Sequence, residues 1–386
     1  MKIAIVSSNE QLMPPPDNVI IASHYVASTL AEGLSAKKHE VYSIAGQGST
    51  IKTKRFFSRS KPFFEVIDKK QWEKLDDQRL MWQLITPFEM DLNLSLLDFL
   101  KTNQVDIVHF HSIIPLYGLP FALRTNLPCI FTLHGTSSRL ELEVIKTFVG
   151  KNIYFVPISN NQRRDYQGIN FVDTVYNGIP LEEYVFNQLG GEAMVLTGRI
   201  KPEKGFEQAM EAAQLTQRKL ILSGDVRASQ EKYFYDIIQP KIKINPNLIH
   251  FFGFVNHSMM DSFFERGKLM LFPIQWEEPF GLVMVEAMAT GTPVVAFARG
   301  AVPEVIKDGV TGLIVNPSDK DIRGNWLIKK TGIAGLCEAV EKIYAMPKAE
   351  YQQMRRNCRQ HVEANFTVEK MVAGYEKVYQ KVLEQP

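Results

Sequence analysis

Short apolar runs of strand type alternate with longer segments of helical periodicity along the whole 386-residue chain. Runs rich in Val, Ile and Phe and bounded by turn residues are typical of buried parallel strands, and the segments between them suit crossover helices. The pattern therefore predicts an α/β protein with two Rossmann-like, doubly wound domains. The expected strands are 2–8, 39–45, 106–112, 129–133, 153–159 and 171–176 in the first half, and 193–198, 219–224, 248–254, 268–273, 293–297 and 312–315 in the second.

The domain boundary is predicted within "YNGIPLEEYVFNQLGGEAM", where Asn-Gly and Gly-Gly turns flank a short segment. We expect residues 1–185 to form an N-terminal domain and residues 186–367 a C-terminal domain. Residues 368–386 have the periodicity of an amphipathic helix, which needs a surface to pack on. The segment 46–65 mixes bases with aromatic residues without clear periodicity, and we expect it to be the least globular part of the chain.

The composition of the chain gives some information on its partners and its location. The chain is 45% hydrophobic and 22% charged, with a formal net charge of +2. This balance gives the whole protein no drive toward nucleic acid, so we expect no nucleic-acid partner. The three cysteines are far apart, and no apolar run reaches the length of a signal peptide or membrane span. These features predict a cytoplasmic protein without a disulfide framework.

The clearest chemical feature is Glu286, which stands in the apolar stretch "WEEPFGLVMVEAMATGTPVVAF". A buried unpaired carboxylate costs several kcal/mol, so Glu286 must meet either a structural base elsewhere in the fold or a ligand. Gly281 is predicted to begin a helix that runs to about Thr290, with its N-terminus at the carboxyl edge of a sheet, where α/β proteins bind ligands and anions. Glu278 cannot share a helix face with Glu286, so we expect the two to address different parts of an elongated ligand.

Positive charge is predicted at the same sheet edge. In "TGRIKPEKG", Gly198 follows a strand and allows close approach of a ligand, while Arg199 and Lys204 can clamp a diphosphate. For Lys204 the alternative is an ordinary solvated lysine. In the first half, His134 ends a strand in "CIFTLHGTS", where it either hydrogen-bonds a substrate hydroxyl or satisfies backbone groups at a turn.

Three other patterns carry weaker signals. His109 and His111 alternate on a strand, and without a third ligand at suitable spacing we interpret them as structural. "GQG" at 46–48 lacks the third glycine of a nicotinamide-binding fingerprint. Asp319-Lys320-Asp321 is interpreted as surface, away from the clustered bases and glutamates. We therefore expect neither a bound metal nor a cofactor.

The stretch "EEPFGLVMVEAMATGTPVVAFARGAVPEVIKDGVTGLIV" resembles the family 4 retaining glycosyltransferases of the GT-B fold. It carries the E-x7-E pattern of that family as Glu278 and Glu286, and "TGRIKPEKG", "HGT" and "YNGIPLEEYVF" extend the resemblance over nearly the whole chain. The resemblance implies two Rossmann-like domains facing across a cleft, with the C-terminal helix returning to the first domain from about Tyr375 to Leu383. It also implies metal-independent sugar transfer from a nucleotide-diphosphate sugar, a UDP-sugar by first expectation, to an acceptor hydroxyl with retention of configuration.

The resemblance further implies roles for individual residues. Arg199 and Lys204 would hold the donor's diphosphate and stabilise the leaving group, and His134 would approach the transferred sugar from the first domain. Glu278 would orient the donor sugar, and Glu286 would accept hydrogen bonds from the ribose. The implied donor-binding residues are Glu286, Gly198, Phe280, Gly281 and Leu282. Many relatives carry a Gly-Gly loop after the first strand, but this chain has "MPPPDNVII" there, which leaves open whether Asp17 or Asn18 takes over that contact.

Other interpretations stay open. On the same fold, the chain could be a sugar phosphorylase or a nucleotide-sugar epimerase, or it could be a non-catalytic sugar-binding protein. The acceptor could be a small molecule, a glycan or a lipid-linked sugar. Residues 52–64 interleave bases with phenylalanines, a composition that suits peripheral contact with an anionic membrane, although a mobile loop on the acceptor side is the preferred interpretation.

Overall fold

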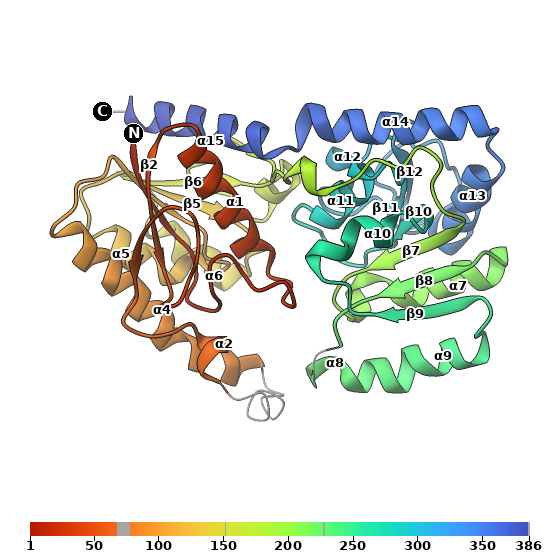
Figure 1. Ribbon diagram of the computed structural model, residues 1–386, viewed down its shortest axis with the longest axis horizontal. Coiled ribbons are helices and arrows are strands. Elements are labelled where there is room, and N and C mark those ends of the chain that lie inside the picture. The colour runs from red at the N-terminus through yellow and green to blue at the C-terminus, as the bar shows by residue number, and fades with distance from the viewer. Residues whose placement is uncertain (68–77, 151, 227, 385–386) are drawn as a thin grey trace. The chain divides into compact units, whose positions relative to one another are not determined.

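The computed structural model describes residues 1–67, 78–150, 152–226 and 228–384 and divides into two compact units (Figure 1). Unit 1 comprises Met1–Gly178 and Val368–Pro386, and unit 2 comprises Ile179–Thr367. The division at Gly178 precedes the expected boundary at residue 185. The reason is local, because the backbone N–H of Ile179 donates to the carbonyl of Phe366 at 2.9 Å and so joins the segment after Gly178 to unit 2.

Each unit is built on a six-stranded parallel sheet, so the predicted α/β class with two doubly wound halves is confirmed. The spatial orders are β3-β2-β1-β4-β5-β6 and β12-β11-β10-β7-β8-β9. Both are the Rossmann order, in which the winding reverses between β1 and β4 and between β7 and β10. The strands of unit 1 are β1 (Lys2–Val6), β2 (Glu40–Ala45), β3 (Lys54–Phe57), β4 (Ile107–Phe110), β5 (Cys129–Leu133) and β6 (Ile153–Pro157). Those of unit 2 are β7 (Ala193–Thr197), β8 (Leu220–Ser223), β9 (Ile249–Gly253), β10 (Gly267–Phe272), β11 (Val294–Phe297) and β12 (Gly312–Val315).

One strand prediction in unit 1 was wrong, and one strand was missed. The expected strand 171–176 only forms an isolated bridge between Phe171 and Phe155 beyond the edge strand β6. The missed strand is β3, which pairs with β2 inside the segment expected to be least globular. Its bases belong to an exposed sheet edge, a common protection against edge-to-edge association, while the Phe56 ring packs against Phe99 at 5.4 Å.

Helices cover both faces of each sheet (Figure 1). In unit 1 they are α1 (Ala22–Ala36), α2 (Phe63–Val66), α4 (Gln78–Leu100), α5 (Leu119–Ala122), α6 (Arg139–Lys146) and α15 (Val368–Leu383). In unit 2 they are α7 (Phe206–Thr216), α8 (Ala228–Tyr233), α9 (Gln239–Ile244), α10 (Met260–Phe264), α11 (Leu282–Ala289), α12 (Val302–Val305), α13 (Gly332–Tyr344) and α14 (Lys348–Asn365). A π-helical segment, Phe234–Ile238, joins α8 to α9.

Alternate strand residues face opposite helical layers. In unit 1, Phe110 and Phe131 stack at 4.4 Å on the face covered by α4 and α5. The opposite face carries α1 and α15, which lie side by side (Figure 1). In unit 2, Leu196 and its counterparts on neighbouring strands pack against α7 and α13. Each sheet therefore has its own apolar core.

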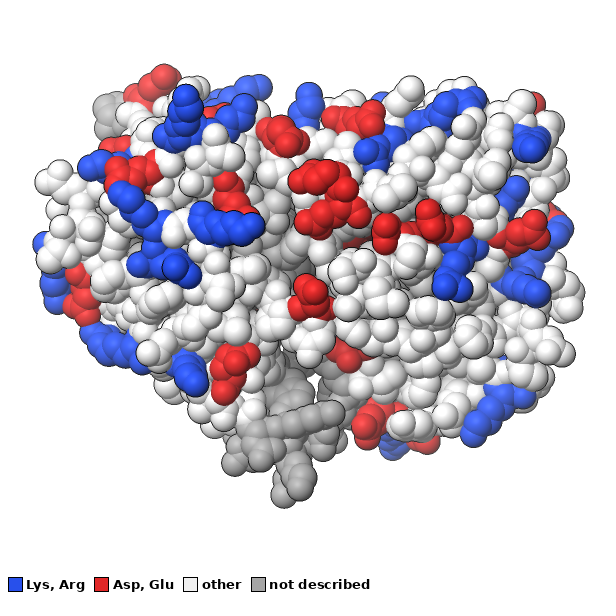
Figure 2. All heavy atoms as spheres, in the orientation of Figure 1, with Lys and Arg blue, Asp and Glu red and all other residues white. Residues whose placement is uncertain are grey.

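Surface charge and cysteine state agree with the composition. Basic and acidic side chains are interspersed over the face shown in Figure 2. Cys129, Cys337 and Cys358 are all free thiols. None of the helices that the structure describes combines the length and apolar character needed to cross a membrane.

Candidate functional site

The carboxyl edge of the second sheet brings predicted site residues together where the winding reverses. The loop after β7 carries Lys204, and the loop after β10 carries Glu278. Lys204 Nζ lies 2.9 Å from Glu278 Oε2, and both side chains are mostly buried. A backbone hydrogen bond of 2.8 Å from Gln275 N–H to the Glu203 carbonyl also joins the two loops. Ligands of doubly wound sheets bind at this kind of reversal, so the pair occupies the expected place.

Glu278 is held through only one of its two carboxylate oxygens. Oε2 accepts hydrogen bonds from Lys204 Nζ at 2.9 Å and from the indole N–H of Trp276 at 3.1 Å. The ammonium of Lys204 also lies 5.0 Å from the centre of the Trp276 ring, within the range of a cation–π contact. Within the described part of the chain, Oε1 has no hydrogen-bond partner. The arrangement fixes the carboxylate while leaving one oxygen for a ligand hydroxyl.

The segment after Glu278 forms the predicted helix start. Gly281 is the N-cap residue of α11, with φ of 83° in the left-handed region. The helix begins at Leu282, has Thr290 as its C-cap residue, and thus has the expected extent. Phe280 is buried, with its ring edge-on to Phe366 at 5.8 Å. The first backbone N–H groups of a helix lack partners within it, so this terminus suits an anionic group.

Glu286 lies inside α11 and is buried. Burial raises its pKa, while His257 and the hydroxyl of Tyr184 act in the opposite direction by favouring the ionised form. His257 is in turn paired with Glu183 at 3.0 Å. Glu286 therefore meets polar groups from two segments distant in sequence, and it does not share the Lys204 contact of Glu278. The two glutamates occupy separate places on unit 2, as expected for different parts of one ligand.

Gly198 and Arg199 stand between β7 and Lys204. A Cβ atom added to Gly198 would meet none of the described heavy atoms within 4 Å, so a ligand can approach the backbone there. Arg199 is half-buried on the same loop as Lys204. The loop thus carries two positive charges, in line with the expected clamp.

A second ion network adjoins Glu278 and corrects the interpretation of Asp321. Arg323 contacts Glu277 at 2.7 Å and Asp321 at 2.8 Å, and Arg299 lies 3.2 Å from Asp321. Asp321 was expected to lie away from the clustered glutamates. The chain beyond β12 instead returns to this edge, so Asp321 neutralises two arginines beside Glu277.

In unit 1, His134 directly follows β5 and is half-buried. Its Nε2 lies 2.9 Å from Nδ1 of His111, which follows β4. Both nitrogens of His109 are also in hydrogen bonds, with Tyr379 at 2.8 Å and Thr132 at 2.7 Å. Burial lowers the pKa of His134 to about 3 and that of His109 to about 3, so these rings are neutral at pH 7. In the described ranges no three His, Cys, Asp or Glu residues form a group that could hold a metal ion.

The loop after β1 is tied to α4 by a buried carboxyl group, Glu89. The hydroxyl of Ser8 donates to its Oε1, as does the backbone N–H of Asn9 at 2.8 Å. Burial raises the pKa of Glu89 to about 8. His24 also binds this loop, because its Nε2–H donates to the Ser8 carbonyl at 3.1 Å, and burial lowers its pKa to about 4. Glu89 and His24 are therefore uncharged near neutral pH.

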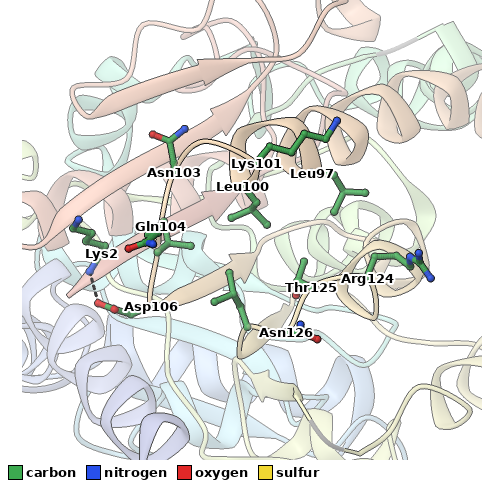
Figure 3. A pocket seen from close by; sticks show the side chains of 12 residues that line it. Lys2, Leu97, Leu100, Lys101, Asn103, Gln104, Asp106, Arg124, Thr125 and Asn126 are labelled. Carbon is green, nitrogen blue, oxygen red and sulfur yellow. Dashed lines mark hydrogen bonds between the residues drawn. The ribbon is translucent and has the colours of Figure 1, made fainter.

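A separate pocket of about 620 Å³ lies at the amino edge of the first sheet (Figure 3). It is lined by Lys2 at the start of β1, by the end of α4, and by residues that precede β4 and β5. Asp106 in its wall accepts the backbone N–H of Lys2 at 2.7 Å. The edge is opposite to the one that carries the predicted site, so the pocket does not belong to it.

Sequence reasoning predicted that Lys204 and Glu278 lie at one sheet edge, but it missed several of the partners that the structure shows. Tyr184 and Arg323 carry no local pattern that marks them, because they meet Glu286 and Glu277 across long sequence separations. Trp276 stands only two residues before Glu278, but nothing in the sequence marks its indole N–H as a partner of that carboxylate. His111 and Glu89 had visible signals, a His at the end of a buried strand and a Glu on the apolar face of a helix. In unit 1 the structure places His134 against another histidine, a partner that the sequence left open.

Comparisons with known proteins agree with this arrangement. The family model described as Glycosyl transferases group 1 matches residues 187–324, and the model Glycosyltransferase Family 4 matches residues 24–183. An uncharacterized 41.2 kDa protein of the Klebsiella pneumoniae cps region is 24% identical over 327 residues, covering 75% of this chain and 82% of that protein.

Solved structures of similar fold cover the chain from end to end. Sucrose-phosphate synthase from Thermosynechococcus elongatus is 20% identical, with a TM-score of 0.75 over 100% of both chains. The Anabaena protein HepE, solved with UDP and glucose, is 16% identical, with a TM-score of 0.69 over 98% of this chain and 99% of its own. At these identities the likeness establishes the fold.

Proposed function

The chain belongs to glycosyltransferase family 4 and has the GT-B fold, and we propose that it transfers a sugar from a nucleotide-diphosphate sugar to an acceptor hydroxyl with retention of configuration. The observation that carries the proposal is the Lys204–Glu278 pair at the winding reversal of the second sheet. Arg199 lies on the same loop as Lys204, and α11 begins four residues after Glu278. One edge thus offers positive charge, helix N–H groups and a carboxylate oxygen.

The proposed chemistry follows from the charges. As the bond between sugar and diphosphate breaks, negative charge develops on the leaving oxygen. Arg199, Lys204 and the first N–H groups of α11 stabilise that charge without a metal ion, because fixed donors aimed at developing charge lower the barrier. The free Oε1 of Glu278 accepts a hydrogen bond from a sugar hydroxyl. The acceptor hydroxyl attacks from the face that the diphosphate leaves and passes its proton to the departing phosphate oxygen, so that a glycoside and a nucleoside diphosphate result.

Two further parts of the proposal concern the donor and unit 1. Glu286 accepts hydrogen bonds from the ribose hydroxyls, a role supported by its buried position within α11. UDP is the first expected nucleotide, a choice supported by the HepE structure with UDP and glucose. His134 donates a hydrogen bond to the transferred sugar. We expect the chain to act in the cytoplasm on a small-molecule, glycan or lipid-linked acceptor.

Thermal unfolding with a panel of nucleoside diphosphates tests the donor site. A ligand at a hundred times its Kd stabilises the native state by about 2.7 kcal/mol. We expect one nucleotide, UDP first, to raise the Tm, and Lys204→Ala to abolish the shift. Lys241→Ala is the matched control, because it breaks an ion pair with Glu207 that is more exposed and lies on helices of the same unit. No shift with any nucleotide would count against the donor proposal.

The reaction is tested by product analysis. The wild-type protein with a UDP-sugar and an acceptor panel should yield a glycoside of the same anomeric configuration as the donor, and added chelator should leave the rate unchanged. Cleavage that requires inorganic phosphate would indicate a phosphorylase, and an altered sugar on the nucleotide would indicate an epimerase. Nucleotide-sugar binding without turnover would favour a sugar-binding protein.

A further inference from the structure

The contact between His111 and His134 in unit 1 determines which nitrogen of each ring carries the proton. His111 is buried and His134 half-buried, and Nδ1 of the first lies 2.9 Å from Nε2 of the second. Burial lowers the pKa of His134 to about 3 and that of His111 well below its ordinary value. Each ring is therefore neutral and carries one N–H, so one ring must donate and the other accept.

The unpaired nitrogen of His111 decides which ring donates. His111 Nε2 is buried and has no hydrogen-bond partner among the described residues. If His134 donated, His111 would carry its proton on this Nε2, a buried N–H without an acceptor. If His111 donates from Nδ1, the same Nε2 is a bare acceptor. Orphaned buried N–H groups are rarer than under-satisfied acceptors, so the second arrangement is favoured.

The surroundings hold both rings in place. The His109 and His111 rings lie 4.2 Å apart, and His109 is fixed by Tyr379 and Thr132. The backbone on either side of His134 is fixed by Gln162, whose Nε2 donates to the carbonyls of Leu133 at 2.8 Å and Gly135 at 2.6 Å. Neither ring can turn freely without loss of packing or of hydrogen bonds.

We propose that His111 is a positioning residue that holds His134 in the Nδ1–H tautomer, with that N–H as the donor to the ligand. The ligand part rests on the proposed function, in which His134 meets the transferred sugar. The chemistry is specific, because a neutral Nδ1–H donates to an uncharged hydroxyl or ether oxygen without adding charge to unit 1. His134 touches the sugar, and His111 acts through it.

The tautomer is measured directly by long-range ¹H–¹⁵N NMR on the full chain without donor or acceptor. We expect His134 to show a protonated Nδ1 and an unprotonated Nε2 in the wild type. His111→Leu, which lacks the donor, should return His134 to the Nε2–H tautomer common in free histidine. His111→Asn keeps an amide near the Nδ1 position and should preserve Nδ1–H. His250→Leu changes an exposed histidine on β9 and is the matched control, with no effect on His134.

Turnover supplies the second readout. His111→Leu should lower kcat for transfer by about ten- to hundredfold while KM for the donor stays within about threefold, because a misplaced contact affects the transition state more than binding. His111→Asn should restore most of kcat.

Two results would overturn the proposal: an Nε2–H tautomer of His134 in the wild type, or an Nδ1–H tautomer that persists in His111→Leu. The expected NMR pattern in a protein that transfers no sugar would support the positioning role and place the failure in the proposed function.

Discussion

The two sheets share one strand order, yet the carboxyl edge of the second sheet carries charged groups and that of the first sheet buries neutral ones. In unit 2 the edge carries charge in ion pairs, with Lys204 on Glu278 and Arg323 on Glu277. In unit 1 the edge buries His111 and Glu89 in their neutral forms. A diphosphate needs compensating charge, whereas hydroxyl groups need neutral donors and acceptors. Under the proposed function, the same topology would serve a charged leaving group in unit 2 and uncharged sugar groups in unit 1.

Removal of the Glu278 charge should have the largest effect, because it takes away the charged group at the edge of the second sheet. Glu278→Gln keeps the side-chain shape but takes away the carboxylate that binds Lys204 and Trp276. We expect kcat for sugar transfer to fall by about 10²–10³-fold, the cost typical of a lost electrostatic contact at a reacting centre. Steady-state kinetics measure the effect. Glu341→Gln, which weakens an exposed pair with Arg218, is the control and should leave kcat unchanged. Equal rates for Glu278→Gln and the wild type would remove Glu278 from the site.

The neutral edge is tested by the pH dependence of stability at Glu89. Its pKa rises from 4.5 to about 8 on folding, because the carboxyl group is buried. Between these values the unfolded chain releases a proton that the folded chain keeps, so this group's contribution to stability is full below pH 4.5 and is lost as pH rises to 8. One pKa unit corresponds to about 1.4 kcal/mol, so the change amounts to a few kcal/mol.

Glu89→Gln removes this titration while preserving a neutral side chain. Urea unfolding at pH 5 and at pH 8 should show that the wild type loses stability relative to the variant across this window. The wild type must be compared with the variant, because His24 also changes the free energy of unfolding with pH. Its pKa is lowered to about 4, so its contribution to stability rises between pH 4 and 6.5, opposite to that of Glu89. Parallel curves for wild type and variant would mean that Glu89 is ionised in the folded protein.

A smaller effect is expected from the backbone that supports Glu278. Gly300 has φ of 59°, and a Cβ atom there would lie 2.2 Å from the Glu278 carbonyl oxygen and 2.3 Å from its nitrogen. Gly300→Ala should cost about 1–3 kcal/mol of unfolding free energy and lower kcat by about tenfold through displacement of Glu278. Gly150→Ala is the control, because Gly150 also has a positive φ, of 121°, but a Cβ atom there would meet none of the described heavy atoms within 4 Å. If both variants lose the same stability and neither loses activity, the close approach has no role in the site.

The sequence predicted the class of both sheets and the extent of α11, because continuous apolar runs bounded by turn residues and glycine-bounded helices are local signals. It also placed Glu278 and Lys204 at one edge, since parallel strands end together. It did not predict that Asp321 returns to Glu277, because that contact depends on the course of a long loop after β12. It also mistook β3 for irregular chain, because an exposed edge strand with Lys54 and Arg55 lacks the continuous apolar run of a central parallel strand.

The basic segment 52–64 contains β3, and we predict the smallest effect of this series, on membrane binding, for this segment. Lys54 is paired with Glu40, and Arg59 with both Asp91 and Asp98, so these charges are already balanced. Among the phenylalanines of this segment, Phe57 is exposed, whereas Phe63 is buried.

Weak membrane contact is therefore the most that this segment should provide. A basic residue near an anionic surface contributes about 1 kcal/mol, so Lys52→Glu should lower binding to phosphatidylserine vesicles at low salt by about fivefold or more, with no binding left at physiological salt. Vesicle co-sedimentation measures this, and Lys243→Glu, an exposed lysine of α9, is the control. Binding that survives physiological salt would show that unit 1 presents an apolar membrane surface in addition to its neutral interior edge. Binding lost equally in the control would assign the attraction to general surface charge.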